Sequence, residues 1–202
     1  TATQLFSPRP IPSIFHRSAG RRRNNDMKHI TIALALLFLV SCTGKPSFDH
    51  PPLSERKLDL EQFFQGEFKA YGQFQDRFGK VRQRFTVAMT GEWDGGTLTL
   101  TEDFSYESGA TEQRIWELTK TEADAWRGTA AGVIGEATGR EAGDRFNWQY
   151  TIDLPQPDKG GTLRVEFDDW MWLLNDDRLL NIAYVERFGI RLGTVTITFE
   201  KQ

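Results

Sequence analysis

One acid and one base that fall within otherwise apolar strand patterns have the clearest potential for chemistry. Glu102 alternates with Leu100 and Phe104, and Arg114 stands in the same way beside Trp116. Residues two apart in a strand share a face, so both charged side chains are expected among apolar groups. On adjacent strands they could pair, and a buried pair must be well hydrogen-bonded because desolvation is costly. Such a pair could bind the head group of an amphipathic ligand, or it could be a structural ion pair or a rim position.

A run of acidic and aromatic residues near the C-terminus is the second group that could bind a ligand. It reads Asp168-Asp169-Trp170-Met171-Trp172, and Asn175-Asp176-Asp177 follows. Calcium takes oxygen ligands, but these acids lack the alternate spacing of a calcium loop, and the second group is typical of a turn. We therefore expect no metal site. Trp170 and Trp172 are expected to fill the core or close a barrel end, with an exposed lid for lipid as the alternative.

Catalysis would depend on carboxylates. Glu102 with Glu186 or Asp169 could form the pair that a glycosidase needs, but no second feature supports a sugar site, and we predict no catalytic residue. His50 is the one histidine after residue 41, and Cys42 is the one cysteine of the sequence. Ser-His-Asp and Cys-His catalysis, the common zinc sites and internal disulfides are therefore excluded, and we expect no cofactor.

Strands must position these side chains. The cleanest alternation places Phe146, Trp148, Tyr150, Ile152 and Leu154 on one face and polar residues on the other. An alternation with a period of two residues indicates a strand with one buried face and one solvent-facing face. Turn signals rich in Gly, Asp and Asn separate further runs of this kind. The sequence predicts nine strands, at residues 66–76, 80–91, 96–106, 111–119, 124–134, 144–154, 161–173, 178–188 and 192–200.

A meander of nine strands with one apolar face must close or fold over, because an open sheet would leave that face in water. Closure also removes unpaired edges. We therefore predict an all-β, antiparallel up-and-down barrel. Leu58, Leu60, Phe63 and Phe64 fall at near-helical spacing and predict one short amphipathic turn before the first strand. A barrel of eight or more strands can hold one apolar ligand.

The N-terminal part has the pattern of a bacterial lipoprotein signal. Lys28 and His29 form a basic region, residues 30–40 are an apolar run, and Ser41 precedes Cys42. The run is too short to span a bilayer as a helix, but it fits the core of a secretory signal. In the lipoprotein pattern that this resembles, the cysteine thiol receives a diacylglycerol and becomes the new N-terminus after cleavage. The following Thr43, by the same resemblance, favours the outer membrane.

These features divide the chain into four parts: an over-extended N-terminal start at residues 1–26, a signal peptide at 27–41, a flexible tether at 42–57 and a barrel domain at 58–202. The whole sequence has a net charge of −3, but residues 42–202 hold 19 Lys and Arg against 27 Asp and Glu, a net charge of −8. Nucleic-acid binding relies on basic patches, so we expect no such partner. The membrane, through the lipid anchor at Cys42, is the expected partner.

Several short sequence motifs together resemble the bacterial lipoprotein family catalogued as domain of unknown function 3833. The match runs from about Leu58 to Lys201, and the resemblance implies a small lipoprotein of the periplasmic face. The motifs are Phe63-Phe64-x-Gly66 with Ala70-x-Gly72, Asp76-Arg77-x-Gly79, Gly91-x-Trp93, Glu102-Asp103-Phe104-x-Tyr106, Arg114-x-Trp116, Gly132-x-Ile134-Gly135-x-Ala137, Trp148-x-Tyr150, Phe167-Asp168-Asp169-Trp170-Met171 and Phe188-Gly189-x-x-Leu192-Gly193.

The helical turn followed by Gly66-Glu67-Phe68 also resembles the start of lipocalins, where a Gly-x-Trp opens the first strand; here Phe68 replaces the Trp. The leading hypothesis is a lipid-anchored, non-enzymatic module of the outer membrane, facing the periplasm, whose interior binds an acyl chain or another apolar molecule. The alternatives are an enzyme that acts on such a molecule and a structural protein with a filled interior. The candidate ligand-binding residues are Glu102, Arg114, Trp116, Trp148, Tyr150 and Trp170.

Overall fold

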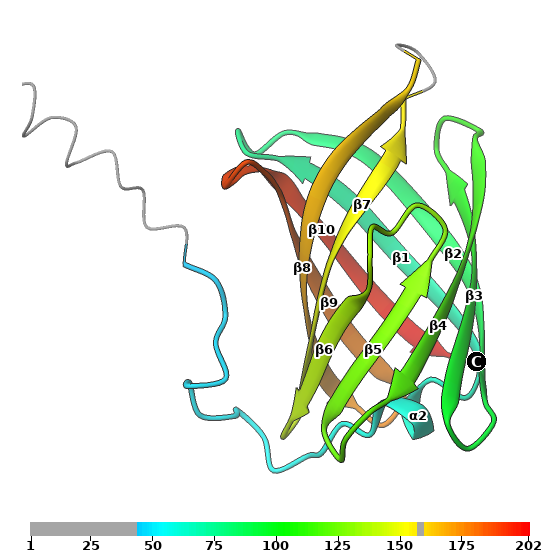
Figure 1. Ribbon diagram of the computed structural model, residues 1–202, viewed down its shortest axis with the longest axis vertical. Helices are drawn as coiled ribbons and strands as arrows, with labels where there is room; N and C mark the ends of the chain where they lie inside the picture. The colour runs from blue at the N-terminus through cyan, green and yellow to red at the C-terminus, as the bar shows by residue number, and fades with distance from the viewer. Residues whose placement is uncertain (1–43, 157–159) are drawn as a thin grey trace, which may run out of the picture. The chain divides into compact units, whose positions relative to one another are not determined.

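The computed structural model describes residues 44–156 and 160–202, and its strands form one closed antiparallel barrel (Figure 1). Each strand pairs with the next along the chain, and the last pairs with the first. The all-β up-and-down barrel is therefore confirmed. The ten strands are β1 (Gly66–Asp76), β2 (Val81–Trp93), β3 (Thr97–Tyr106), β4 (Thr111–Lys120), β5 (Ala125–Ala130), β6 (Ala137–Ala142), β7 (Arg145–Pro155), β8 (Thr162–Asn175), β9 (Arg178–Arg187) and β10 (Ile190–Lys201).

Three predictions fall outside the described residues: the over-extended start at residues 1–26, the signal peptide at 27–41 and the attachment of lipid to Cys42. Within the described part, no helix has the length and apolar character needed to cross a membrane.

The predicted count of nine strands is wrong, because residues 137–142 form a tenth strand, β6. Their sequence has no apolar alternation and is typical of a turn. Gly139 occupies an inward position opposite Trp126 and Trp148. A Cβ atom there would lie 2.5 Å from Trp148 Cε3 and 2.8 Å from Phe146 Cζ. The rings of β7 thus fill the volume that an apolar side chain of β6 would need, so this strand requires no apolar pattern of its own.

The alternating residues of β7 point into the barrel, as predicted. Phe146 and Trp148 are buried, with 1% and 4% of their surface exposed. They lie opposite Met171 and Asp169 of β8 in the antiparallel register, and Tyr150 lies opposite Phe167. Directly opposed residues share a face of the sheet, so this register also decides which residues of β8 face the lumen.

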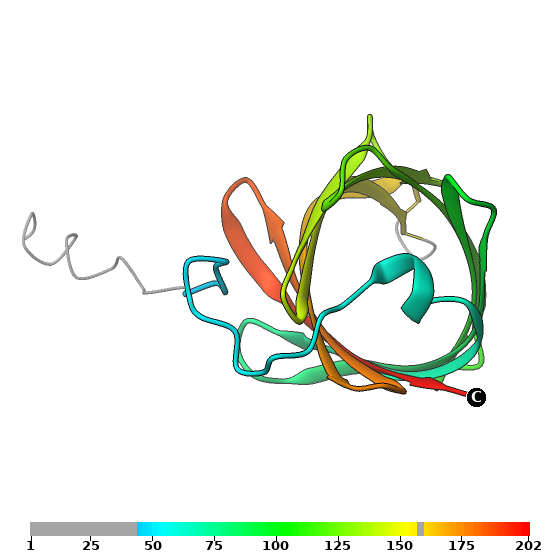
Figure 2. The same cartoon turned by 90° about the horizontal axis from the view of Figure 1, so that it is seen from below.

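One end of the barrel is closed by the short helix α2 (Leu60–Phe63), which lies across the opening (Figure 2). Asp59 caps the helix by accepting a hydrogen bond from the backbone amide of Gln62 at 3.2 Å. Leu60, Phe63 and Phe64 are buried and join the core. The predicted amphipathic turn is therefore present, and its apolar side forms the floor of the barrel.

Polar contacts fix this helix to the barrel wall. Glu61 forms an ion pair with Lys120 at the end of β4. Glu141 on β6 accepts hydrogen bonds from the indole of Trp126 on β5, at 2.7 Å, and from the backbone amide of Leu60, at 3.3 Å. The helix is thus linked directly to β4 and β6, and through Glu141 to β5, and the lumen is closed at this end.

The segment before the helix contacts the outer wall of the barrel. The ring of Phe48 lies 4.8 Å from that of Trp170 between centroids. Arg145 Nη1 donates a hydrogen bond to the carbonyl of Ser47 at 3.1 Å, and the backbone amide of Leu58 donates to the carbonyl of Gly143 at 2.8 Å.

Gly91 gives a test of the closed end. A Cβ atom at this position would lie 1.6 Å from the carbonyl oxygen of Phe64, directly behind the helix. We expect Gly91→Ala to destabilise the fold by at least the ~1–3 kcal/mol typical of overpacking, because the obstacle is backbone. In the control Gly96→Ala, the nearest atom is Asp94 Oδ1 at 3.8 Å, and stability should change by no more than about 0.5 kcal/mol. Urea denaturation followed by tryptophan fluorescence measures both. Equal stabilities would contradict this account of the floor.

Candidate functional site

Polar side chains from five strands point into the lumen of an otherwise apolar barrel. They are Glu102 on β3, Arg114 on β4, Tyr150 on β7, Asp169 on β8 and Asn181 on β9. Glu102 and Arg114 lie directly opposite each other in the register of β3 and β4. Glu102, Arg114, Tyr150 and Asp169 influence one another's pKa values, and Asn181 donates a hydrogen bond to Asp169, so the five residues form one cluster. We refer to these five residues as the lumen cluster.

Arg114 makes its ion pair with a residue of its own strand. Its Nη2 donates to Glu112 Oε1 at 2.5 Å, and its guanidinium carbon lies 5.4 Å from the centre of the Phe104 ring. Glu102 feels the charge of Arg114 but accepts no hydrogen bond from any described residue. The pairing considered from the sequence is therefore replaced by an Arg114–Glu112 pair, and the Glu102 carboxyl keeps its acceptor atoms available.

Asp169 is the most deeply buried charged group of the lumen cluster, with 6% of its surface exposed. Its Oδ1 accepts a hydrogen bond from Asn181 Nδ2 at 3.1 Å, whereas its Oδ2 makes no hydrogen bond of normal length and angle, although the Tyr150 hydroxyl lies close enough to act as a donor that lowers the pKa of Asp169. Asn181 also donates to the backbone carbonyl of Trp170 at 3.3 Å, so its amide is fixed in place. An unsatisfied buried acceptor costs about 1–3 kcal/mol. Asp169 Oδ2 is therefore a place where a donor from a bound molecule would add stability.

Burial changes the protonation of both acids. Loss of solvation raises the pKa of Glu102 to about 7, and the nearby Arg114 only partly opposes this. Burial likewise raises the pKa of Asp169 to about 7, against the hydrogen bond from Asn181. Burial, followed by the charge of Asp169, raises the pKa of Tyr150 well above its usual value. Near neutral pH each carboxyl of the lumen cluster therefore carries a proton part of the time.

Aromatic rings flank the lumen cluster. The Trp116 ring lies 4.9 Å from that of Tyr150 and 5.8 Å from that of Trp148, and Tyr150 stacks on Phe167 at 5.0 Å between centroids. A polar group surrounded by rings in this way is the usual composition of a small-molecule site, which combines apolar walls with a few polar atoms.

Burial differs along the barrel axis. Inward residues next to the helix are buried: Phe68, Met89, Leu98, Leu118, Phe146, Leu179 and Phe199. At the level of the lumen cluster, inward residues keep accessible surface although they point away from the outer wall: Glu102, Arg114, Tyr150, Val195 and Ile197 are all half-buried. The lumen is thus packed at its floor and again at the opposite end, where Ile152, Val165 and Val185 form a second buried cluster, while several inward side chains between these two levels keep accessible surface.

The structure brings together five of the six residues predicted from the sequence: Glu102, Arg114, Trp116, Trp148 and Tyr150. Trp170 is the exception. It lies opposite Asn147 and Ile182 on the outer face, and it is buried because Phe48 covers it from outside. The expectation that Trp170 fills the core or closes a barrel end is therefore wrong. Trp170 instead packs against Phe48, in the segment before the helix, on the outer face of the barrel.

The sequence analysis did not select Asn181, and it considered Asp169 only for a metal site or an acid pair. Residues 167–174 contain apolar side chains at both odd and even positions, so alternation alone does not show which set faces inward. The signal that could have found Asp169 is the pairing of β8 with β7, whose inward face is unambiguous. No group of three or more His, Cys, Asp or Glu side chains in the described residues is arranged to hold a metal ion.

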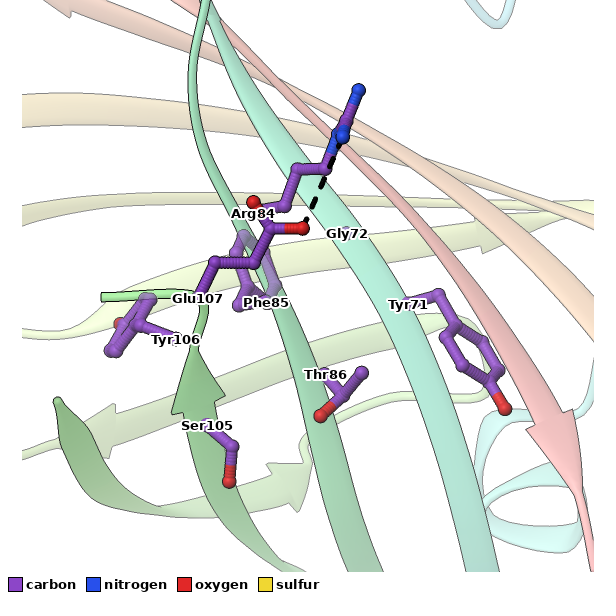
Figure 3. Close-up of a pocket in the computed structure, with 8 residues that line it drawn as sticks. All are labelled: Tyr71, Gly72, Arg84, Phe85, Thr86, Ser105, Tyr106 and Glu107. Atoms are coloured by element: carbon purple, nitrogen blue, oxygen red, sulfur yellow. Dashed lines mark ion pairs between the residues drawn. The ribbon is translucent and has the colours of Figure 1, made fainter. Parts of the chain in front are cut away.

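A second candidate is a depression of about 430 Å³ on the wall formed by β1, β2 and β3 (Figure 3). The side chains of Tyr71, Thr86 and Ser105 lie apart from one another there, and Arg84 and Glu107 form an exposed ion pair at 3.9 Å. None of the buried polar atoms that lack a partner among the described residues belongs to its lining. The depression therefore has fewer features of a ligand site than the lumen.

The chain matches the model of one protein family, described as "Protein of unknown function (DUF3833)", over residues 36–201. Among solved structures, it is similar to the S-type phycobiliprotein lyase of Guillardia theta, with 11% identity, a TM-score of 0.55 and coverage of 75% of this chain and 98% of that one. It is also similar to a DUF3598 protein of unknown function from Nostoc punctiforme, with 12% identity, a TM-score of 0.52 and coverage of 75% and 52%. These likenesses show a shared lipocalin-like barrel. Curated proteins gave no match.

The raised pKa values predict that stability depends on pH in a defined direction. Between about pH 4 and pH 7 the folded state binds protons at Glu102 and Asp169 that the unfolded state has released, so stability should fall as pH rises through this window. The loss is on the order of 3 kcal/mol for each group, at 1.4 kcal/mol per pKa unit. Replacing both by amides, in Glu102→Gln with Asp169→Asn, should remove most of this slope.

Glu117→Gln is the matched control, because Glu117 is exposed on the outer face of β4. Urea denaturation at a series of pH values from 4 to 9 measures the slopes. If the double variant loses stability with rising pH as steeply as the parent chain does, the two carboxyls do not titrate in the lumen as described.

Proposed function

The chain belongs to the family described as "Protein of unknown function (DUF3833)", and we propose that it binds a hydrophobic small molecule in the lumen of its barrel. The observation that carries the proposal is Oδ2 of Asp169, which is buried on the inner wall beside the buried Trp148 and the half-buried Tyr150. This oxygen lacks a hydrogen bond of normal geometry, and the Tyr150 hydroxyl is the one donor near it among the described residues. A buried acceptor of this kind in a native fold calls for a partner. A bound molecule with a hydrogen-bond donor at one end supplies it.

The charge balance of the lumen indicates the chemistry of that end. Three carboxyls, those of Glu102, Glu112 and Asp169, share one arginine, and Arg114 is already paired with Glu112. Ionised carboxylates only accept hydrogen bonds. The free groups are therefore acceptors, and the polar end of the ligand is an N–H donor, most favourably a protonated amine. A fatty acid carboxylate would add a further negative charge beside Glu102 and Asp169.

The body of the ligand would lie against the rings. Trp116, Trp148 and Tyr150 form one side of the lumen at the level of the two free carboxyls. Burial of apolar surface against such rings contributes about 25 cal/mol for each Å² removed from water. The ligand is therefore an amphipathic molecule whose chain or ring system is apolar and whose donor faces Asp169.

Two other functions were considered from the sequence. A structural protein with a filled core agrees with the packed floor and with the buried cluster at the opposite end but leaves the accessible inward residues between them without a role. An enzyme is favoured by one observation, since a pKa near 7 at Glu102 and at Asp169 suits proton transfer at neutral pH. The pair of Glu102 with Glu186 is not formed, because Glu186 is on the outer face and contacts Arg191 at 3.6 Å.

Dodecylamine and dodecanoate give a direct test, because they share a chain and differ in the charge of the head. At pH 8 and below the micellar range, dodecylamine should quench tryptophan fluorescence and bind at least about tenfold more tightly than dodecanoate. Asp169→Asn should weaken the binding of the amine by about tenfold or more, as expected for a charge-assisted hydrogen bond, whereas Glu117→Gln should not. Equal affinity for the two probes, or unchanged binding by Asp169→Asn, would contradict the proposed head-group site.

Native mass spectrometry of purified protein separates the remaining functions. A co-purified molecule recovered with unchanged mass after incubation supports binding, and conversion to a product of different mass supports catalysis. Failure of any apolar molecule to bind would favour the structural function.

For its location, we propose that the chain is a lipoprotein of the outer membrane that faces the periplasm. The support is the order of the basic residues at 28–29, the apolar run at 30–40 and the small residue before Cys42. Several acyl chains on one cysteine would hold the protein at the bilayer without a membrane helix, since each buried methylene contributes about 0.8 kcal/mol.

Labelled palmitate tests this location. In Gram-negative cells that express the chain from Met27, the label should enter the protein and the protein should fractionate with the outer membrane. Cys42→Ser should abolish both. Label that persists without Cys42, or parent protein that carries none, would contradict the anchor.

A further inference from the structure

The same three residues occur at two neighbouring turns of the barrel. Arg77-Phe78-Gly79 connects β1 to β2, and Arg187-Phe188-Gly189 connects β9 to β10. Both turns lie at the end opposite α2 (Figure 1). They adjoin each other, because β1 pairs with β10 up to Asp76 and Gly193, and the backbone amide of Arg77 donates to the carbonyl of Leu192 at 2.9 Å. We refer to these six residues as the paired tips.

Each tip exposes a phenyl ring. Phe78 is 79% exposed and Phe188 is 83% exposed, and Ile190 beside the second tip is 55% exposed. The guanidinium of the preceding arginine lies over each ring, at 4.8 Å for Arg77 and 4.9 Å for Arg187. Large apolar side chains gathered at one point of a surface indicate an interaction site.

Phe188 is also in an unfavourable backbone conformation. Its φ of +53° lies in the left-handed region, and it is the one described residue other than glycine with a positive φ. Glycine or asparagine would occupy this turn position with less strain. The backbone of Phe188 is strained and its ring is exposed, so the residue does not stabilise the fold through burial. Such a residue is expected where the side chain contacts another molecule.

The paired tips are basic within an acidic protein. Residues 76–82 and 186–191 hold five basic and two acidic side chains, whereas residues 42–202 as a whole have a net charge of −8. The two acids are already paired, Asp76 with Arg82 and Glu186 with Arg191. The remaining cations, at Arg77, Lys80 and Arg187, form no ion pair with any described residue.

We propose that the paired tips dock on a bilayer surface that contains anionic phospholipid. Two convex turns that each present one ring fit a headgroup layer, in which rings enter the acyl boundary while arginine and lysine face phosphate. A protein partner would instead need two matched pockets. Docking places the end of the barrel opposite α2 at the bilayer. This inference rests on the tips alone and stands without the ligand site.

Co-sedimentation with vesicles tests the docking. The chain from residue 44 onward is suitable, because residues 46–202 form one compact unit with all ten strands and the core. It should sediment with vesicles of phosphatidylethanolamine and phosphatidylglycerol and not with vesicles of phosphatidylcholine alone. Phe78→Ser combined with Phe188→Gly should weaken binding by about tenfold or more at every salt concentration. Arg77→Gln with Arg187→Gln should weaken it mainly at low salt, by about fivefold or more.

Leu53→Ser is the matched control, since Leu53 is 99% exposed but lies in the segment before the helix. Its vesicle binding should equal that of the parent. Phe188→Gly alone should be no less stable than the parent, which separates lost docking from lost folding. The proposal is overturned if the parent chain does not bind anionic vesicles, or if the double phenylalanine variant binds them as tightly as the parent. It is also overturned if sedimentation velocity shows that the tips mediate self-association instead.

Discussion

The pairing of Trp148 with Asp169 across β7 and β8 is the constraint on which the site depends. In an antiparallel ladder directly opposed residues share a face, so the inward rings of β7 oblige Asp169 to face the lumen and send its neighbour Trp170 outward. A shift of one residue would turn Trp170 into the lumen and Asp169 to the outer face. Eleven successive residue pairs between β7 and β8 hold the register. The packing of the other inward residues of these strands offsets the free-energy cost of burying the Asp169 carboxyl.

The two ends of the barrel differ in what covers them: helix α2 lies across one end, and, in the part of the chain that the structure describes, only turns between strands lie at the other. At the floor, the helix brings Leu60 and Phe63 into the core, and Lys120 and Glu141 hold it there through polar contacts. The opposite end has no helix across it among the described residues, but Ile152, Val165 and Val185 form a second buried cluster there, and the inward side chains between the two clusters keep accessible surface. The proposed ligand would therefore lie between the two buried clusters, at the level of the lumen cluster. The paired tips lie at the end opposite α2.

Much of the fold could be predicted from alternation, because residues 145–154 show a dry face without ambiguity. Glu102 and Arg114 were also predictable, since each interrupts an apolar face. Strand β6 was not, because the volume above Gly139 is filled by rings from another strand. The outward position of Trp170 depends on a cover by Phe48, more than 100 residues earlier in the chain. Nor does the sequence show that Arg114 contacts Glu112 while one oxygen of Asp169 lacks a hydrogen bond of normal geometry. These are properties of three-dimensional neighbours.

The central claim is that the buried carboxyl of Asp169 accepts a hydrogen bond from a donor group of the ligand. Carbon-13 NMR of the aspartate carboxyl carbons, assigned with Asp169→Asn, measures its titration directly. The account predicts a pKa of about 7 without ligand and a clear downward shift when dodecylamine is bound, because an N–H donor stabilises the ionised form. A carboxyl that titrates near the usual value for aspartate, or one whose pKa is unmoved by the bound amine, would contradict it.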